Sequence, residues 1–123
     1  MQPNDRFTVD EDCLFVNVFA PSNATTESRL PVMYFVQGGG FQSNSNANFN
    51  GGDLATFGNM VVVQVNYRVG PFGFLQSAEV QAAGSLNNGL KDVIQGLNWL
   101  KQHVTMVSPS PSRREAEPVS RMK

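Results

Sequence analysis

The sequence predicts an α/β fold, and two observations are the main support for this prediction. Two apolar segments, residues 32–36 and the valine-rich residues 61–65, are each followed by a glycine-dense loop, at 38–40 and at 70–73. Such runs are typical of buried strands, and glycine-rich loops at strand ends are typical of a site at the edge of an α/β sheet. The order strand, loop, strand, loop, helix, with no tight hairpin signal between the later strands, indicates the same fold class.

The bulk composition narrows the classes of function. A chain of 123 residues with 41% apolar residues is long enough for one modest domain. Its net charge of −1 provides no field to attract nucleic acid or an anionic membrane, so no nucleic-acid partner is expected. No segment has the apolar length that a membrane span needs, and residues 1–13 are polar and acidic, unlike a signal peptide. With one cysteine and one histidine, neither an internal disulfide nor an ordinary metal site is expected, and no cofactor is predicted.

The first half of the chain is expected to form two strands. Residues 11–20 alternate between apolar and polar side chains, which is the period of a half-buried strand. Residues 21–28 have loop composition, and Pro31 then opens the next strand at its first position, where a missing N–H is tolerated. Asn23 begins an N-A-T sequence, a glycosylation sequon that would be used only in a secreted chain.

The middle of the chain is expected to hold a short helix, a buried strand and two loops. The helix is predicted over 52–57, with Asp53 near its start, where the helix dipole favours a negative charge. After the strand 61–65, a Gly-Pro-Phe-Gly sequence at 70–73 predicts a turn. Residues 76–86 are polar and predict a second loop.

The clearest helix is predicted over residues 87–104, with Asn87 or Asn88 as its N-cap. Apolar residues with helical spacing form a single stripe that we expect to pack in the core rather than to bind a ligand: Leu90, Val93, Ile94, Leu97, Leu100 and Val104. His103 lies at the end where the helix dipole favours a positive charge. Residues 105–123 contain three prolines and no apolar period, so this tail is expected to be disordered.

Four segments of the chain, in the same order, resemble the motifs of a known family. They are EDCLFVNVFAP at 11–21, QGGGF at 37–41, NYRVGPFGFL at 66–75 and NGLKD at 88–92. Together they are similar to the type-B carboxylesterase, lipase and cholinesterase family of the α/β-hydrolase fold, over roughly residues 5–104. The resemblance implies a partial α/β-hydrolase domain at 1–104, with the N-terminal strands and first helix of the central sheet, and a tail outside the family at 105–123.

The resemblance also implies roles for the glycine loop. On the residues alone, the three glycines at 38–40 fit a flexible turn as well as a functional loop. The family pattern makes the backbone N–H groups of Gly39 and Gly40 the oxyanion-hole donors, which stabilise the negative oxygen formed during ester hydrolysis. Gly38 and Phe41 become candidates for substrate binding. The implied partner is a small-molecule carboxylic ester.

Three other residues are expected to serve structure rather than catalysis. Arg68 at a strand end is expected to form an ion pair, with Glu11 or Asp12 as the carboxylate. Cys13 matches a family cysteine that is usually bridged to one in a preceding segment, which supplies no partner here. We do not expect it to be a nucleophile, because no histidine lies near it in the sequence. His103 is expected to be a surface residue at a helix end and not a catalytic base.

The family hydrolyses esters through a serine in a G-x-S-x-G motif, and the sequence contains no such motif. The family's usual interval leads to Ser120, which lacks both flanking glycines. We therefore expect an inactive chain: an N-terminal portion of a carboxylesterase, or the product of a gene model that leaves the family frame after Val104. Family and sequon suggest secretion.

Two alternatives stay open. One is a non-catalytic cholinesterase-like binding or adhesion module, which keeps the fold and loses the catalytic residues. The other is that the chain does not fold stably, because three strands and one long helix would leave sheet edges uncovered, with the apolar segments 32–36 and 61–65 prone to aggregate.

Overall fold

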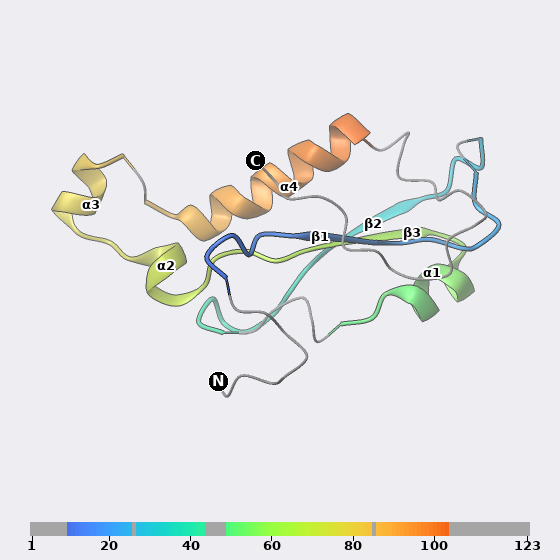
Figure 1. Ribbon diagram of the computed structural model, residues 1–123, viewed down its shortest axis with the longest axis horizontal. Helices are drawn as coiled ribbons and strands as arrows, with labels where there is room; N and C mark the ends of the chain where they lie inside the picture. The colour runs from blue at the N-terminus through green and yellow to red at the C-terminus, as the bar shows by residue number, and fades with distance from the viewer. Residues whose placement is uncertain (1–9, 26, 44–48, 85, 104–123) are drawn as a thin grey trace.

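The computed structural model describes residues 10–25, 27–43, 49–84 and 86–103. Its elements, in chain order, are β1 (Val16–Phe19), β2 (Val32–Val36), α1 (Gly52–Gly58), β3 (Val61–Val65), α2 (Gly70–Phe74), α3 (Ala78–Ala82) and α4 (Asn88–His103). The sheet has the order β1-β3-β2, with β1 antiparallel and β2 parallel to the central strand. Figure 1 shows α4 lying along one face of this sheet and α1 on the other side. The predicted α/β fold is confirmed.

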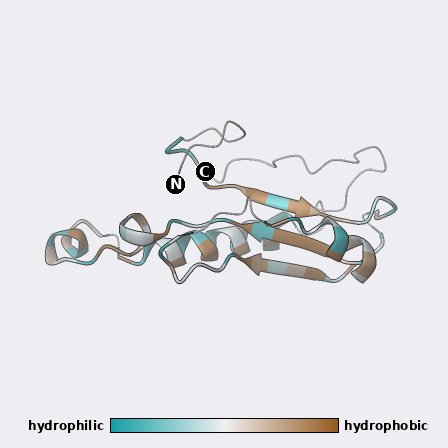
Figure 2. Ribbon diagram, turned by 90° about the horizontal axis from the view of Figure 1, so that it is seen from below, coloured by the Kyte–Doolittle hydropathy of each residue, from teal (hydrophilic) through white to brown (hydrophobic). Residues whose placement is uncertain are grey.

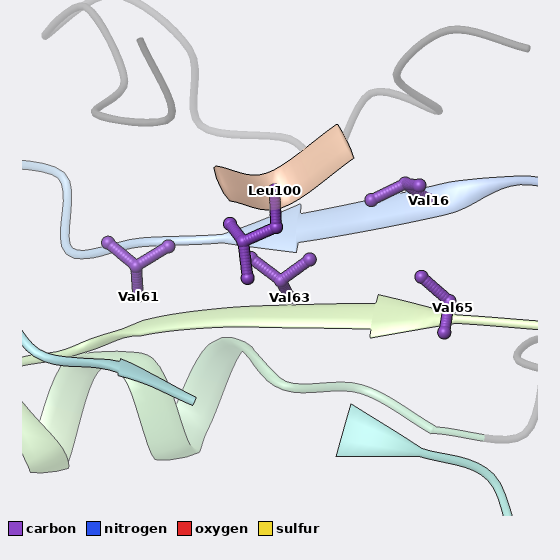
Figure 3. Packing of buried hydrophobic residues seen from close by; sticks show 5 residues of the cluster. All are labelled: Val16, Val61, Val63, Val65 and Leu100. Atoms are coloured by element: carbon purple, nitrogen blue, oxygen red, sulfur yellow. The ribbon is translucent and has the colours of Figure 1, made fainter. Parts of the chain in front are cut away.

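Strand β3 is the centre of the structure. All five of its residues are buried, as expected for an apolar strand paired on both edges. Alternate side chains point to opposite faces, so Val61, Val63 and Val65 share one face. There they pack against Val16 of β1 and Leu100 of α4, which Figure 3 shows converging between the strands and the helix. Most of the length of the strands is coloured as hydrophobic in Figure 2.

The opposite face of β3 is covered where α1 begins. A Cβ added at Gly51 would lie 2.8 Å from the ring of Phe19 and 3.0 Å from Val62, so the backbone itself forms this contact. Gln64 is fully buried on this face, and the side-chain amide of Asn17, its partner in the β1–β3 register, donates to it at 3.4 Å. The predicted short helix at 52–57 is confirmed, with Asp53 in its first turn.

Helix α4 packs on the sheet through small residues, and this corrects one expectation. Its buried positions follow helical spacing and comprise Gly89, Asp92, Gly96 and Leu100. A Cβ at Gly96 would lie 2.5 Å from the Tyr34 hydroxyl and 2.7 Å from Val65, so the helix backbone lies close to the strands. The predicted apolar stripe lies beside this line, and most of it was wrongly assigned to the core: Leu90, Ile94 and Leu97 are 46%, 58% and 43% exposed. Val104 lies outside the described residues.

Three other boundaries differ from the sequence prediction. The turn at 70–73 is the short helix α2, which proline favours near its first position. The polar loop at 76–86 contains α3, capped by the Ser77 hydroxyl, which accepts the Val80 N–H at 3.2 Å. Strand β1 begins at Val16 and not at residue 11, because the Phe15 N–H bonds to the Asn66 side chain at 2.7 Å instead of to a strand. The predicted disordered tail at 105–123 lies outside the described residues.

Tyr34 provides a pH-dependent contact between β2 and α4. Its hydroxyl donates to the Val93 carbonyl at 2.8 Å, and burial raises the pKa of the phenol from 10.0 to about 12. A pKa that is raised on folding gives stability that is complete below the unfolded pKa and lost as the pH rises through the folded pKa. We therefore expect the free energy of unfolding to fall between pH 10.0 and about 12.

The variant Tyr34→Phe tests this expectation. It should destabilise the chain by about 1 kcal/mol at neutral pH, because one net hydrogen bond is lost. It should also show a shallower alkaline decline, since no phenol remains at this position to ionise. Urea unfolding of both proteins at neutral and alkaline pH measures the difference. Equal alkaline slopes for the two proteins would contradict the assignment.

Candidate functional site

The glycine loop after β2 comprises residues 37–41. Two of its three glycines, Gly39 and Gly40, have backbone angles that favour glycine. Gly39 and Gly40 have φ values of 123° and 60°, and Phe41 follows at 63°. Side chains with a Cβ rarely adopt such values, so the first two positions favour glycine and Phe41 is strained. The N–H groups of Gln42 and Ser43 close the turn on the Gly39 carbonyl, at 3.1 and 3.3 Å. Residues 38–40 are exposed, as backbone donors to a ligand must be.

Two hydrogen bonds from the segment after β3 hold this loop, one on each side of its glycines. The Tyr67 hydroxyl donates to the Gln37 carbonyl at 3.1 Å, and both residues are buried. The Gly70 N–H donates to the Phe41 carbonyl at 2.6 Å. Figure 1 shows the loop after β2 beside α2, at one end of the sheet. The loop is therefore held by residues 66–70, which continue the neighbouring parallel strand and are called the extension of β3 below.

An open cleft of about 490 Å³ lies between the loop and α2. Residues 40–42 line one side, and residues 70–71 and 74–76 line the other. The ring of Phe41 packs against Phe74, with centroids 5.2 Å apart, and forms a T-shaped pair with Tyr67, with centroids 6.3 Å apart. Phe41 and Gly40 thus line the cleft, whereas Gly38 and Gly39 are not among its lining residues. Phe74 lies in the segment 66–75 that resembles a family motif, and no role was predicted for it from the sequence.

Arg68 forms the ion pair that was expected of it, but with a different carboxylate. Its guanidinium bonds to Asp92 of α4 through Nε at 2.7 Å and through Nη2 at 2.6 Å. The backbone N–H of Arg68 bonds to the same carboxylate at 3.0 Å. The prediction of Glu11 or Asp12 as the partner was wrong. The sequence pattern around Arg68 does not show which distant helix supplies the carboxylate. Asp92 lies in the NGLKD motif, which was the available signal.

The pair is asymmetric in its exposure. The Asp92 side chain is 6% exposed and that of Arg68 is 41% exposed. The hydrogen bond to Asp92 raises the pKa of the Arg68 guanidinium, so this group stays charged wherever the protein is folded. The pair joins the extension of β3 to α4. Neither Arg68 nor Asp92 lines the cleft.

The remaining candidates lie away from the glycine loop. Cys13 is a free, exposed thiol, and the Asn66 side chain bonds to its carbonyl at 2.5 Å. Asn23 is exposed in a turn, so its side chain is accessible. His103 is the last residue of α4, where its ring stacks on Trp99 at 4.8 Å and its Nδ1 lies 2.8 Å from the Trp99 carbonyl.

The described ranges contain neither a cluster of metal-binding side chains nor a helix that could span a membrane. No group of three or more histidine, cysteine, aspartate or glutamate side chains in them could hold a metal ion. In the same ranges, no helix combines the length and the apolar character that crossing a bilayer requires.

The chain is similar to known esterases and lipases. A model of the carboxylesterase family matches residues 1–113. The human protein named carboxylesterase 5A is 38% identical over 107 residues, which is 87% of this chain and 18% of that protein. Secreted lipase 1 of Botryotinia fuckeliana is 40% identical over 108 residues, which is 84% of this chain and 19% of the lipase.

Solved structures agree with the sequence comparison. The crystal structure of Aspergillus niger EstA superposes with a TM-score of 0.74 at 49% identity, and covers 83% of this chain and 20% of EstA. The chain therefore spans about a fifth of the length of the relatives that it matches. From the family match, the sequence motifs and the shared architecture, we conclude that this chain belongs to the type-B carboxylesterase family of the α/β-hydrolase fold.

Proposed function

We propose that residues 1–104 of this chain are the N-terminal portion of a type-B carboxylesterase, and that the glycine loop at 37–41 is its oxyanion loop. The N–H groups of Gly39 and Gly40 would be the donors. The observation that supports this most is the left-handed backbone at both glycines, in a loop tied on either side to the extension of β3. A loop fixed in this way presents its amides without reorganisation, which is what stabilisation of a developing charge requires.

The proposed chemistry is the hydrolysis of a carboxylic ester. A serine supplied by the rest of the enzyme passes its proton to a histidine base as its oxygen attacks the ester carbonyl; the π electrons of the carbonyl move onto its oxygen, and the two amides bind the resulting oxyanion. When the oxyanion collapses, the alcohol leaves with that proton, and water then releases the acid from the acylated serine by the same steps. The cleft beside Phe41 and Phe74 is apolar enough to take a hydrocarbon part of the substrate. Because the sequence holds no G-x-S-x-G motif, we propose that the chain alone does not hydrolyse esters.

A chimera tests the proposal. Residues 10–103 of this chain replace the matching segment of Aspergillus niger EstA, whose 49% identity makes the exchange feasible. We expect the chimera to hydrolyse p-nitrophenyl butyrate, and the 123-residue chain to give no rate above buffer. A folded but inactive chimera would contradict the esterase role and would favour the non-catalytic binding module.

Within the active chimera, Gly40→Ala should lower kcat about tenfold and leave KM nearly unchanged. The added methyl group meets no atom within 4 Å, so the effect comes from the φ of 60°, which alanine resists. A relaxed loop moves its amide away from the oxyanion. Phe72→Leu serves as the control, because Phe72 is 82% exposed and does not line the cleft. An unchanged kcat in Gly40→Ala would count against Gly40 as a donor.

We also propose that the protein is secreted and glycosylated at Asn23. The relative from Botryotinia fuckeliana is named a secreted lipase, and Asn23 is exposed in a turn. When the chain is expressed behind a leader in a eukaryotic secretory pathway, endoglycosidase treatment should shift its mobility by one glycan. Asn23→Gln should remove this shift. A wild-type chain that is secreted without a shift would refute modification at this residue.

A further inference from the structure

The three glycines of the loop have no side chains with which to hold themselves in place. Their geometry must therefore come from neighbours, and the two bonds to the Gln37 and Phe41 carbonyls are placed at either end of the glycine run. Both donors come from one short segment after β3. Of these two donors, Tyr67 is the easier to test, because Tyr67→Phe removes only the hydroxyl oxygen that makes the bond, whereas the Gly70 donor is a backbone N–H.

We propose that Tyr67 is a positioning residue that holds the Gly39 and Gly40 amides in their geometry, together with the ring pair of Phe41 and Phe74. This inference rests on the proposed function of the loop. Tyr67 is 6% exposed, and its hydroxyl donates to the Gln37 carbonyl at 3.1 Å. The same ring forms a T-shaped pair with the ring of Phe41, at a centroid distance of 6.3 Å. Tyr67 thus touches both flanks of the glycine run.

The strain at Phe41 supports the same conclusion. A non-glycine residue at a φ of 63° is strained, and this conformation persists only when its surroundings hold it. Here its carbonyl accepts the Gly70 N–H at 2.6 Å, and its ring packs on Phe74 at 5.2 Å. Without these contacts, Phe41 would relax to a negative φ and would turn the preceding glycines with it.

The chain offers a matched control for the test. Tyr34, like Tyr67, donates its hydroxyl to a backbone carbonyl, but that carbonyl belongs to Val93 of α4. Tyr67→Phe and Tyr34→Phe therefore remove the same kind of bond at two places. A general loss of stability would affect both variants, whereas loss of loop geometry should follow only the first.

The measurement is ¹⁵N relaxation and amide hydrogen exchange in the full 123-residue chain. In Tyr67→Phe we expect the order parameters of Gly39 and Gly40 to fall from about 0.85 to below about 0.6. The Gly70 N–H should exchange at least about tenfold faster, while the amides of β3 keep their protection. Tyr34→Phe should leave all three glycine values unchanged. Equal values at Gly39 and Gly40 in the two variants would overturn the proposal.

A second variant keeps the test decisive if Tyr67→Phe does not fold. Phe41→Leu removes the ring contacts and should loosen the same amides, and Phe41→Tyr, which keeps the ring, should restore them. In the active chimera, Tyr67→Phe should lower kcat about fivefold with KM retained, and Tyr34→Phe should change neither. An inactive chimera would refute the proposed function, whereas the order parameters would still decide the role of Tyr67.

Discussion

Gly73→Ala is expected to destabilise the fold by about 3 kcal/mol or more, the upper part of the range for overpacked sites. A Cβ at Gly73 would collide with the backbone carbonyl of Arg68, and no flexible side chain could give way. The same carbonyl lies 2.5 Å from the position of a Cβ at Gly89 in α4. The backbone at Arg68 is therefore held between α2 and α4. The two helices can approach it this closely only because residues 73 and 89 are glycines.

Urea unfolding followed by circular dichroism measures this effect, with Gly38→Ala as the matched control. A Cβ at Gly38 meets no atom within 4 Å, and its φ lies outside the left-handed region, so the change should be within about 0.5 kcal/mol. Equal unfolding midpoints for the two alanine variants would show that the backbone at Gly73 can shift at little cost.

Asp92→Ala is expected to lower the free energy of unfolding by about 2–3 kcal/mol, an effect second only to that of Gly73→Ala. The carboxylate accepts three hydrogen bonds from Arg68, two from the guanidinium and one from the backbone N–H. Removing one partner of a fully buried pair costs about 3–5 kcal/mol. Because the Arg68 side chain is 41% exposed, water replaces part of what the guanidinium loses, and the expected cost is smaller.

A double-mutant cycle with Arg68→Ala separates the pair from its surroundings. We expect a coupling free energy of about 1–2 kcal/mol, and less at high salt because one partner is exposed. Asp53→Ala is the control, since Asp53 is an exposed carboxylate in the first turn of α1 and should contribute only a few tenths of a kcal/mol. Additive effects of the two substitutions would show that Asp92 stabilises the fold through its bond to the backbone alone.

Several elements with local signals were predicted from the sequence, although the short helices α2 and α3 were predicted as a turn and a loop. Four of the five residues of strand β3 are valines, and its burial on both faces was expected from that composition, Gln64 being the polar exception. The resemblance to the family motif identified Gly39 and Gly40 as site residues. Both have the positive φ that glycine adopts more readily than other residues. These features depend on residues that are adjacent in the chain.

Features that depend on distant residues were missed or misassigned. Asp92 was not identified as the partner of Arg68, because the pair joins residues 24 apart in the sequence. The line of Gly89 and Gly96 on α4 has no hydrophobic signal, although it is the line that lies against the sheet. Apolar periodicity pointed instead to the neighbouring stripe, since it measures side-chain type and not how closely a backbone can approach.

The ties between the glycine loop and the extension of β3 have a consequence for how the site forms during folding. Tyr67 and the Gln37 carbonyl are 30 residues apart, on segments that meet only when β2 and β3 have paired in parallel across α1. Such non-local pairing forms only after the entropy of closing the intervening loop has been overcome. The loop geometry should therefore appear in the same cooperative step as the sheet, and a peptide of residues 30–43 alone should sample it only rarely.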